Sequence, residues 1–149
     1  MAANKLSIIC MSGDFDKAIA VFTEAIRHNA RYAVAYENRG YAYGEKGDLA
    51  KAIADYTEAI RLDPKQCAAY RGRGYYYREK GDLDKANSEF LESIRLRPKS
   101  AFAHYDLGLV LQRQNKPHDA ANEFRQALAI DPQLRAARDA LSNMGPAAN

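Results

Sequence analysis

A short block of residues recurs along the chain at a fixed interval of 34 residues. Gly-Asp followed by an apolar residue occurs at residues 13–15, 47–49 and 81–83, and Pro64, Pro98 and Pro132 keep the same step. Self-similarity at a fixed period of this size is typical of repeat proteins, in which each unit buries its apolar face against the next. We therefore expect the 149 residues to stack similar units within a single domain.

Each interval has the pattern of two helices separated by a turn. Apolar residues follow helical spacing on both sides of Gly47. Gly47 can adopt the left-handed conformation that ends a helix, and the Asp48 side chain can accept hydrogen bonds from the first amides of the next helix. The second helix is expected to end at Asp63, because the residue before Pro64 is disfavoured in helical geometry. The interval is thus predicted to be helix, turn, helix and short turn.

The spaced residues of the three full intervals resemble the tetratricopeptide repeat, which has the pattern W-x2-L-G-x2-Y, then A-x3-F, then P. The resemblance covers about nine tenths of the chain. It implies an all-α fold, a right-handed α-solenoid of antiparallel helix pairs with a C-terminal capping helix. The matching residues are Tyr36-x2-Arg39-Gly40-x2-Tyr43, Ala52-x3-Tyr56 and Pro64, then Tyr70-x2-Arg73-Gly74-x2-Tyr77, Ala86-x3-Phe90 and Pro98, then His104-x2-Leu107-Gly108-x2-Leu111, Ala120-x3-Phe124 and Pro132.

The resemblance implies one solenoid domain over residues 1–143. Residues 1–32 are expected to form an incomplete first repeat, in which Ala18-x3-Phe22 fits the second helix while the first helix lacks its Gly and its leading aromatic residue. Either Leu6, Ile8 and Ile9 form an irregular opening helix, or the chain is cut from a longer array. Full repeats are expected at 33–66, 67–100 and 101–134, a capping helix at 134–143 and a loose tail at 144–149.

Glycine in the middle of a helix costs about 1 kcal/mol against alanine, so Gly40, Gly74 and Gly108 need a compensating role. The expected role is close approach of the two helices of a repeat, with large side chains filling the space between small ones. The side chains assigned to this core, rather than to a binding site, are Tyr43, Tyr56, Tyr77, Phe90 and Phe124.

The first helices of the repeats form the inner wall of such a solenoid, and we expect this groove to bind a partner. Tyr41 and Tyr75 lie on that wall and are not demanded by the repeat pattern. Aromatic rings beside Arg and carboxylates are typical of protein-binding surfaces. The alternative is that these tyrosines seal neighbouring repeats. The candidate partner-binding residues are Glu37, Asn38, Tyr41, Arg71, Tyr75, Arg78, Phe102, Tyr105, Asp106 and Leu109.

Some members of the family hold the C-terminal carboxylate of a chaperone peptide with a clamp of Lys, Asn and Arg side chains. Asn38 matches one Asn position of that clamp. Its basic positions fall on Ala3, Ala68 and Gly72, which carry no charge. We therefore expect no chaperone-tail clamp in this chain.

The remaining composition argues against other classes of function. The net charge is +3, but Lys and Arg alternate with Asp and Glu, so no nucleic-acid partner is expected. Cys10 and Cys67 lack metal-site spacing and are expected to be reduced, half-buried thiols. The three histidines are far apart in the repeats, and no apolar run is long enough to span a membrane. We expect no catalytic residue, no metal and no cofactor, and a cytoplasmic location.

The leading hypothesis is a non-catalytic interaction module or scaffold that binds a peptide or helix of another protein in its concave groove. Two alternatives stay open at this point. The array could self-associate into a homo-oligomer through its ends or its groove, or it could be a regulatory part of a larger enzyme or secretion assembly. Fold alone does not choose among them.

Overall fold

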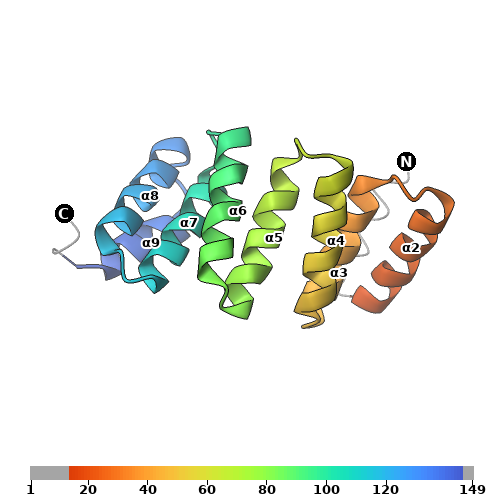
Figure 1. Ribbon diagram of the computed structural model, residues 1–149. Coiled ribbons are helices and arrows are strands. Elements are labelled where there is room, and N and C mark those ends of the chain that lie inside the picture. The colour runs from red at the N-terminus through yellow and green to blue at the C-terminus, as the bar shows by residue number, and fades with distance from the viewer. Residues whose placement is uncertain (1–13, 146–149) are drawn as a thin grey trace. The chain divides into compact units, whose positions relative to one another are not determined.

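The computed structural model describes residues 14–145, and in this range it contains eight α-helices and no strand (Figure 1). This confirms the all-α prediction. The expected opening helix around Leu6, as well as Ala3 and Cys10, lies outside the described residues. The helices are α2 (Phe15–His28), α3 (Ala33–Glu45), α4 (Leu49–Leu62), α5 (Cys67–Lys80), α6 (Leu83–Leu96), α7 (Ala101–Arg113), α8 (Pro117–Ile130) and α9 (Arg135–Asn143).

The chain divides into two compact units. The first ends at Tyr76 and the second begins at Tyr77, so the division falls within α5. Each unit is built from consecutive helices that pack against one another, and each is described by itself below. The expectation of one domain over residues 1–143 stays a prediction.

The Gly-Asp steps form the turns that the sequence predicts. Gly47 has a φ angle of 85°, in the left-handed region that other residues rarely adopt. The Asp48 carboxylate then accepts a hydrogen bond of 3.2 Å from the Lys51 amide in the first turn of α4. The same helix ends at Leu62, with Asp63 outside helical geometry before Pro64. The boundaries of α4 are therefore set locally, by one glycine, one cap and one proline.

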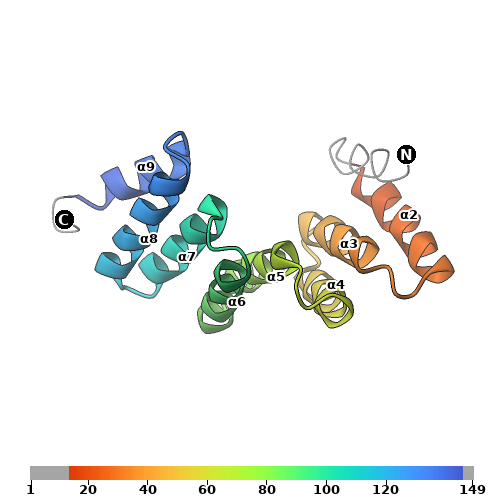
Figure 2. The same ribbon diagram turned by 90° about the horizontal axis from the view of Figure 1, so that it is seen from above.

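The core of the first unit alternates alanines with aromatic rings. Helices α3 and α4 lie side by side (Figure 2). Small alanine side chains let neighbouring helices approach, and aromatic rings fill the space that remains between them. One cluster, between α2 and α3, contains Ala18, Phe22, Ala35 and Ala42. A second, formed by α4 and α5, contains Ala52, Tyr56, Ala59, Ala69 and Tyr76.

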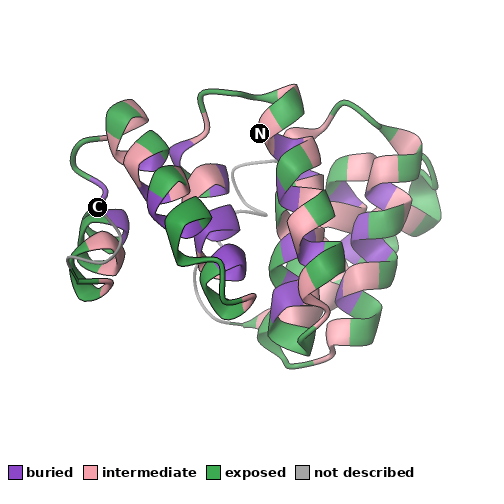
Figure 3. Cartoon of the chain, turned by 60° about the vertical axis from the view of Figure 1, so that its left-hand side comes forward, coloured by how far each residue is buried: buried purple, intermediate pink, exposed green. Residues whose placement is uncertain are grey.

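The core of the second unit follows the same principle. Each helix has buried residues on one side and exposed residues on the other (Figure 3). A Cβ atom at Gly108 would lie 2.5 Å from the buried ring of Phe124, so the glycine is what lets α7 approach α8. The C-terminal helix α9 covers the end of this core through Ala137. The main cluster contains Ala86, Phe90, Leu107, Val110, Leu111, Ala120 and Phe124.

Three of the five aromatic residues assigned to the core, Tyr56, Phe90 and Phe124, are buried as predicted. Tyr43 and Tyr77 are half-buried and pack against the core clusters of the first and second units, as predicted. Each ring also contacts an ammonium group. The Nζ atom of Lys51 lies 5.3 Å from the centroid of the Tyr43 ring, and the Nζ atom of Lys85 lies 5.4 Å from that of Tyr77. The outer edge of each core is therefore closed by a cation over a ring.

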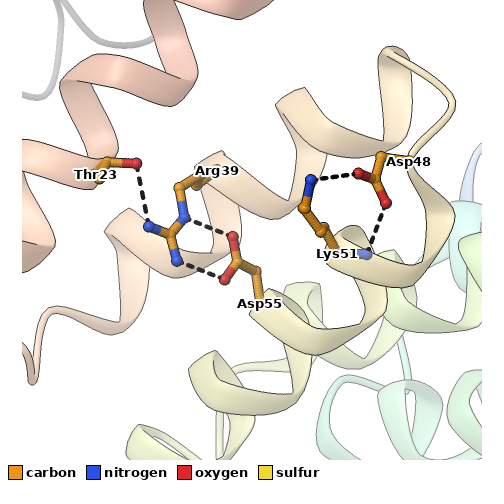
Figure 4. A network of polar contacts seen from close by, with 5 residues as sticks. All are labelled: Thr23, Arg39, Asp48, Lys51 and Asp55. Carbon is orange, nitrogen blue, oxygen red and sulfur yellow. Dashed lines mark hydrogen bonds and ion pairs between the residues drawn. The ribbon is translucent and has the colours of Figure 1, made fainter.

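A polar network joins three helices of the first unit at a position where the family pattern has leucine. Arg39 on α3 donates from Nε and Nη2 to the Asp55 carboxylate of α4, at 2.7 and 2.8 Å, and from Nη1 to the Thr23 hydroxyl of α2 at 3.2 Å (Figure 4). The hydrogen bonds to Asp55 raise the pKa of Arg39. Arg73, one interval later, donates to the Thr57 hydroxyl at 3.0 Å. Arginine therefore replaces leucine here with a bidentate ion pair.

Candidate functional site: a tyrosine-lined pocket in the first unit

A pocket of about 500 Å³ opens on the first unit, where side chains of α3, α4 and α5 meet. Its size is within the range of pockets that hold a side chain or a small ligand. The lining combines tyrosines, two carboxylates and one guanidinium. Its residues are Glu37, Tyr41, Glu45, Tyr56, Ala68, Arg71, Gly72, Tyr75 and Tyr76.

Two buried tyrosines form the floor of the pocket. The side chains of Tyr56 and Tyr76 are 5% and 2% exposed, and their ring centroids lie 5.7 Å apart. Tyr76 occupies the space above Gly44, and Tyr56 occupies the space beside Gly72, where a Cβ atom would lie 2.8 Å from the Tyr56 hydroxyl oxygen. Both rings depend on a glycine in the neighbouring helix, so the floor is fixed by complementary large and small residues.

Two exposed tyrosines form the rim. Tyr41 on α3 is 39% exposed and Tyr75 on α5 is 37% exposed. Each rests edge-on against a ring beneath it: Tyr41 against Phe15 at 6.2 Å and Tyr75 against Tyr76 at 5.1 Å between centroids. The backbone oxygen of Tyr41 also accepts a hydrogen bond of 3.3 Å from the Tyr76 hydroxyl. Rings held in place and still exposed offer contact area at a small entropic cost.

The charges of the pocket lie on α3 and α5. Burial raises the pKa of Glu37, and a hydrogen bond donated by the Gln66 side-chain amide partly offsets this. Burial, followed by the nearby Glu37 carboxylate, also holds the pKa of Tyr56 well above its usual range, against the opposing effect of Arg71. The floor hydroxyl of Tyr56 therefore stays neutral at any physiological pH.

Four of the ten predicted site residues line this pocket, namely Glu37, Tyr41, Arg71 and Tyr75. Asn38 lies on the same helix, but its side-chain amide donates to the Val34 backbone oxygen at 2.8 Å within α3. The remaining five belong to helices of the second unit or to the last turns of α5.

Arg78 and Asp106 are both buried, which does not fit the expectation that they line an accessible groove. The Arg78 Nη1 atom lies 3.2 Å from the Asp106 carboxylate. The Arg113 guanidinium donates to the Arg78 backbone oxygen at 3.0 Å in the same region. A buried ion pair with additional hydrogen bonds serves the internal structure of the second unit rather than contact with a partner.

Phe102, Tyr105 and Leu109 occupy different environments on α7. Phe102 is 53% exposed, whereas Leu109 packs against the main cluster of the second unit. Tyr105 is half-buried, with its ring centroid 5.9 Å from that of Phe124. Of the three, Phe102 alone keeps a largely exposed side chain.

The floor of the pocket was not predicted from the sequence. Tyr56 was expected in the core alone and Tyr76 was not expected at the site, because neither position differs in composition from an ordinary packing residue. The available signal was the pair of extra glycines, Gly44 and Gly72, which the repeat pattern does not require. Each marks a place where a tyrosine from a neighbouring helix comes close.

Within residues 14–145, no helix is long and apolar enough to cross a bilayer. The same range holds no cluster of three or more His, Cys, Asp and Glu side chains placed to bind a metal ion. Cys67 is half-buried at the start of α5.

Comparison with protein families gives three matches along the chain. Two different tetratricopeptide repeat profiles match residues 33–66 and 101–134, and a TPR repeat profile matches residues 74–115. None of the curated protein sequences compared with the chain matches it significantly.

Several solved structures are similar in fold. The crystal structure of MamA has a TM-score of 0.84 at 22% identity, over 93% of this chain and 81% of MamA. The TPR domain of Arabidopsis OM64 has a TM-score of 0.73 at 24% identity, over 76% of this chain and 93% of that domain. The first TPR of Spaghetti (RPAP3), solved with the HSP90 peptide SRMEEVD bound, has a TM-score of 0.75 at 21% identity, over 77% of this chain and 91% of that one.

Proposed function

Because the chain belongs to the tetratricopeptide repeat family, we propose that it is a non-catalytic interaction module that binds a peptide segment of another protein in the tyrosine-lined pocket of its first unit. The observation that carries the proposal is the pair of exposed rings, Tyr41 and Tyr75, standing over a closed aromatic floor. Anchored tyrosines around a pocket are typical of the residues that dominate binding energy at protein interfaces.

The peptide bound to the first TPR of Spaghetti supports this kind of activity, since that protein has the same fold. The chemistry of the pocket differs from a chaperone-tail clamp, however. Ala68 and Gly72 line it where that clamp has basic side chains, and Asn38 bonds to its own helix. The partner peptide is therefore expected to be held by rings and carboxylates rather than through its terminal carboxylate.

The proposal is tested by selecting random dodecapeptides displayed on phage against the full chain and measuring the selected peptides by fluorescence anisotropy. Replacing both Tyr41 and Tyr75 by alanine should weaken binding by roughly 1–3 kcal/mol for each anchor. The matched control is Leu91→Ala, which truncates a side chain that is 53% exposed on α6 of the second unit. Failure to select any peptide, or equal binding by the double variant, would overturn the proposal.

A further inference from the structure

We propose that the pocket of the first unit receives a basic side chain, lysine or arginine, of the partner peptide. The inference rests on the proposed function and names the chemistry of the residue that fills the site. It follows from three independent features of the pocket: its aromatic walls, its carboxylates and the hydroxyl group at its floor.

The walls of the pocket consist largely of tyrosine rings. Tyr41 and Tyr75 stand at the rim, and Tyr56 and Tyr76 lie below them. The face of an aromatic ring carries partial negative charge and attracts an ammonium or guanidinium group, while the ring body packs against its methylene stem. A long basic side chain therefore complements both the depth and the surface chemistry of the site.

Two carboxylates line the pocket from one helix face. Glu37 and Glu45 are both on α3, about two helical turns apart, and Arg71 faces them from α5. Two negative groups against one positive group leave one net negative charge in the lining. Glu37 and Glu45 both act to raise the pKa of Tyr56, and Arg71 acts to lower it. The net negative charge of the lining attracts a cation that enters the site and repels an anion.

The floor holds a polar atom suited to an incoming donor. Tyr56 is 5% exposed and lines the pocket, and burial keeps its hydroxyl group in the neutral form. Because the hydroxyl stays neutral, its oxygen can accept a hydrogen bond from an ammonium or guanidinium group.

The test uses three acetylated and amidated pentapeptides, Gly-Ala-X-Ala-Gly, in which X is lysine, norleucine or glutamate. Each is titrated into the ¹⁵N-labelled full chain, and the amide signals of Tyr41, Arg71 and Tyr75 are followed. The lysine peptide should shift these signals in a saturable manner. The norleucine peptide, which has the same stem without the charge, should bind at least about fivefold more weakly, and the glutamate peptide more weakly still.

Charge variants separate a cation site from an anion site. Glu37→Gln with Glu45→Gln should weaken binding of the lysine peptide at least about fivefold and leave the norleucine peptide unchanged. Arg71→Gln should strengthen it, because the one opposing charge is removed. The control is Glu58→Gln on α4, which removes a carboxylate that pairs with Arg61 outside the pocket. Melting curves of every variant verify that the fold is retained.

The outcomes distinguish this inference from the proposed function. Selected library peptides that depend on Tyr75 and are rich in lysine or arginine support both. Selected peptides that depend on Tyr75 but lack basic residues, or a glutamate peptide whose binding Arg71→Gln abolishes, overturn the inference and leave the proposed function standing. If the library peptides bind the tyrosine variants as well as the original chain, both fall.

Discussion

The ring of Tyr76 on α5 fills the space above Gly44 on α3, where any Cβ atom would overlap it. The ring is 2% exposed and also packs against Tyr56, so it has little freedom to withdraw. This contact joins two first helices that belong to successive repeats. The absence of a side chain at Gly44 therefore leaves the space that the Tyr76 ring fills at the floor of the pocket.

Gly44→Ala should destabilise the protein by about 1–3 kcal/mol, because the added methyl group displaces a buried ring. Helix propensity alone predicts the opposite sign, a gain of about 1 kcal/mol. Urea unfolding followed by circular dichroism measures the difference.

A double-mutant cycle supplies the control for Gly44→Ala. In a Tyr76→Val background, which places the residue type of Val110 one repeat earlier, the ring is gone and the same substitution should be neutral or stabilising. Equal destabilisation in both backgrounds would show that the Tyr76 ring is not the cause.

Asp55→Ala should cost about 3 kcal/mol, because it leaves the Arg39 guanidinium without its bidentate partner in a largely buried position. Adding Arg39→Leu should restore most of the loss, since leucine is the residue that the repeat pattern has there and Leu107 occupies the equivalent position in a later repeat.

The comparison for this pair is Arg61→Ala. Arg61 pairs with Glu58 on the surface of α4, where its side chain is 64% exposed. Exposed pairs of this kind contribute at most about 0.5 kcal/mol. Chemical unfolding that gave the same loss for Arg61→Ala and Asp55→Ala would contradict the assignment of the Arg39–Asp55 pair as structural.

The helices were predictable because each boundary depends on local chemistry. The left-handed Gly47, the Asp48 cap and the proline at residue 64 act on their immediate neighbours, and the left-handed glycine recurs one period later at Gly81. The pairing of Tyr76 with Gly44 is different in kind. It depends on contact between residues in successive repeats. A sequence pattern that describes a single repeat does not describe such contacts.

Polar residues account for the other departures from the sequence analysis. Arg78 and Asp106 are charged and fall on the face of the helix that should be exposed, so composition alone places them in the groove. The structure buries them because each supplies the charge that the other needs. Tyr75 and Tyr76 show the same limit, since adjacent residues of identical type differ only in the direction in which the helix points them.

Glu37→Gln should stabilise the protein at neutral pH. Burial raises the pKa of this carboxyl above its ordinary value of 4.5, so the folded state binds its proton more tightly than the unfolded state does. Stability from this group is therefore highest below pH 4.5 and falls as the pH rises through the raised pKa.

The measurement is the free energy of unfolding of the original chain and of Glu37→Gln from pH 4 to pH 8. The two curves should converge at the acidic end and separate as Glu37 ionises. Glu58 is the comparison, because its effect on the pH dependence of stability should have the opposite sign. The hydrogen bond from Arg61 lowers the pKa of Glu58. Curves for Glu37→Gln that separate towards low pH would contradict the assignment.

Tyr75→Ala and Tyr76→Ala should have opposite profiles although the two residues are adjacent on α5. Tyr76 is a buried residue of the core cluster, so its truncation leaves a cavity and should cost about 3 kcal/mol or more. Tyr75 is 37% exposed and its ring meets that of Tyr76 in a T-shaped contact, so its loss should cost at most about 1 kcal/mol. Thermal melts give the stabilities, and anisotropy with a selected peptide gives the affinity per folded molecule. Binding should fall for Tyr75→Ala with the fold intact. A large loss of stability for Tyr75→Ala, with affinity per folded molecule unchanged, would show that this tyrosine seals neighbouring repeats, and the binding surface would then have to lie elsewhere on the chain.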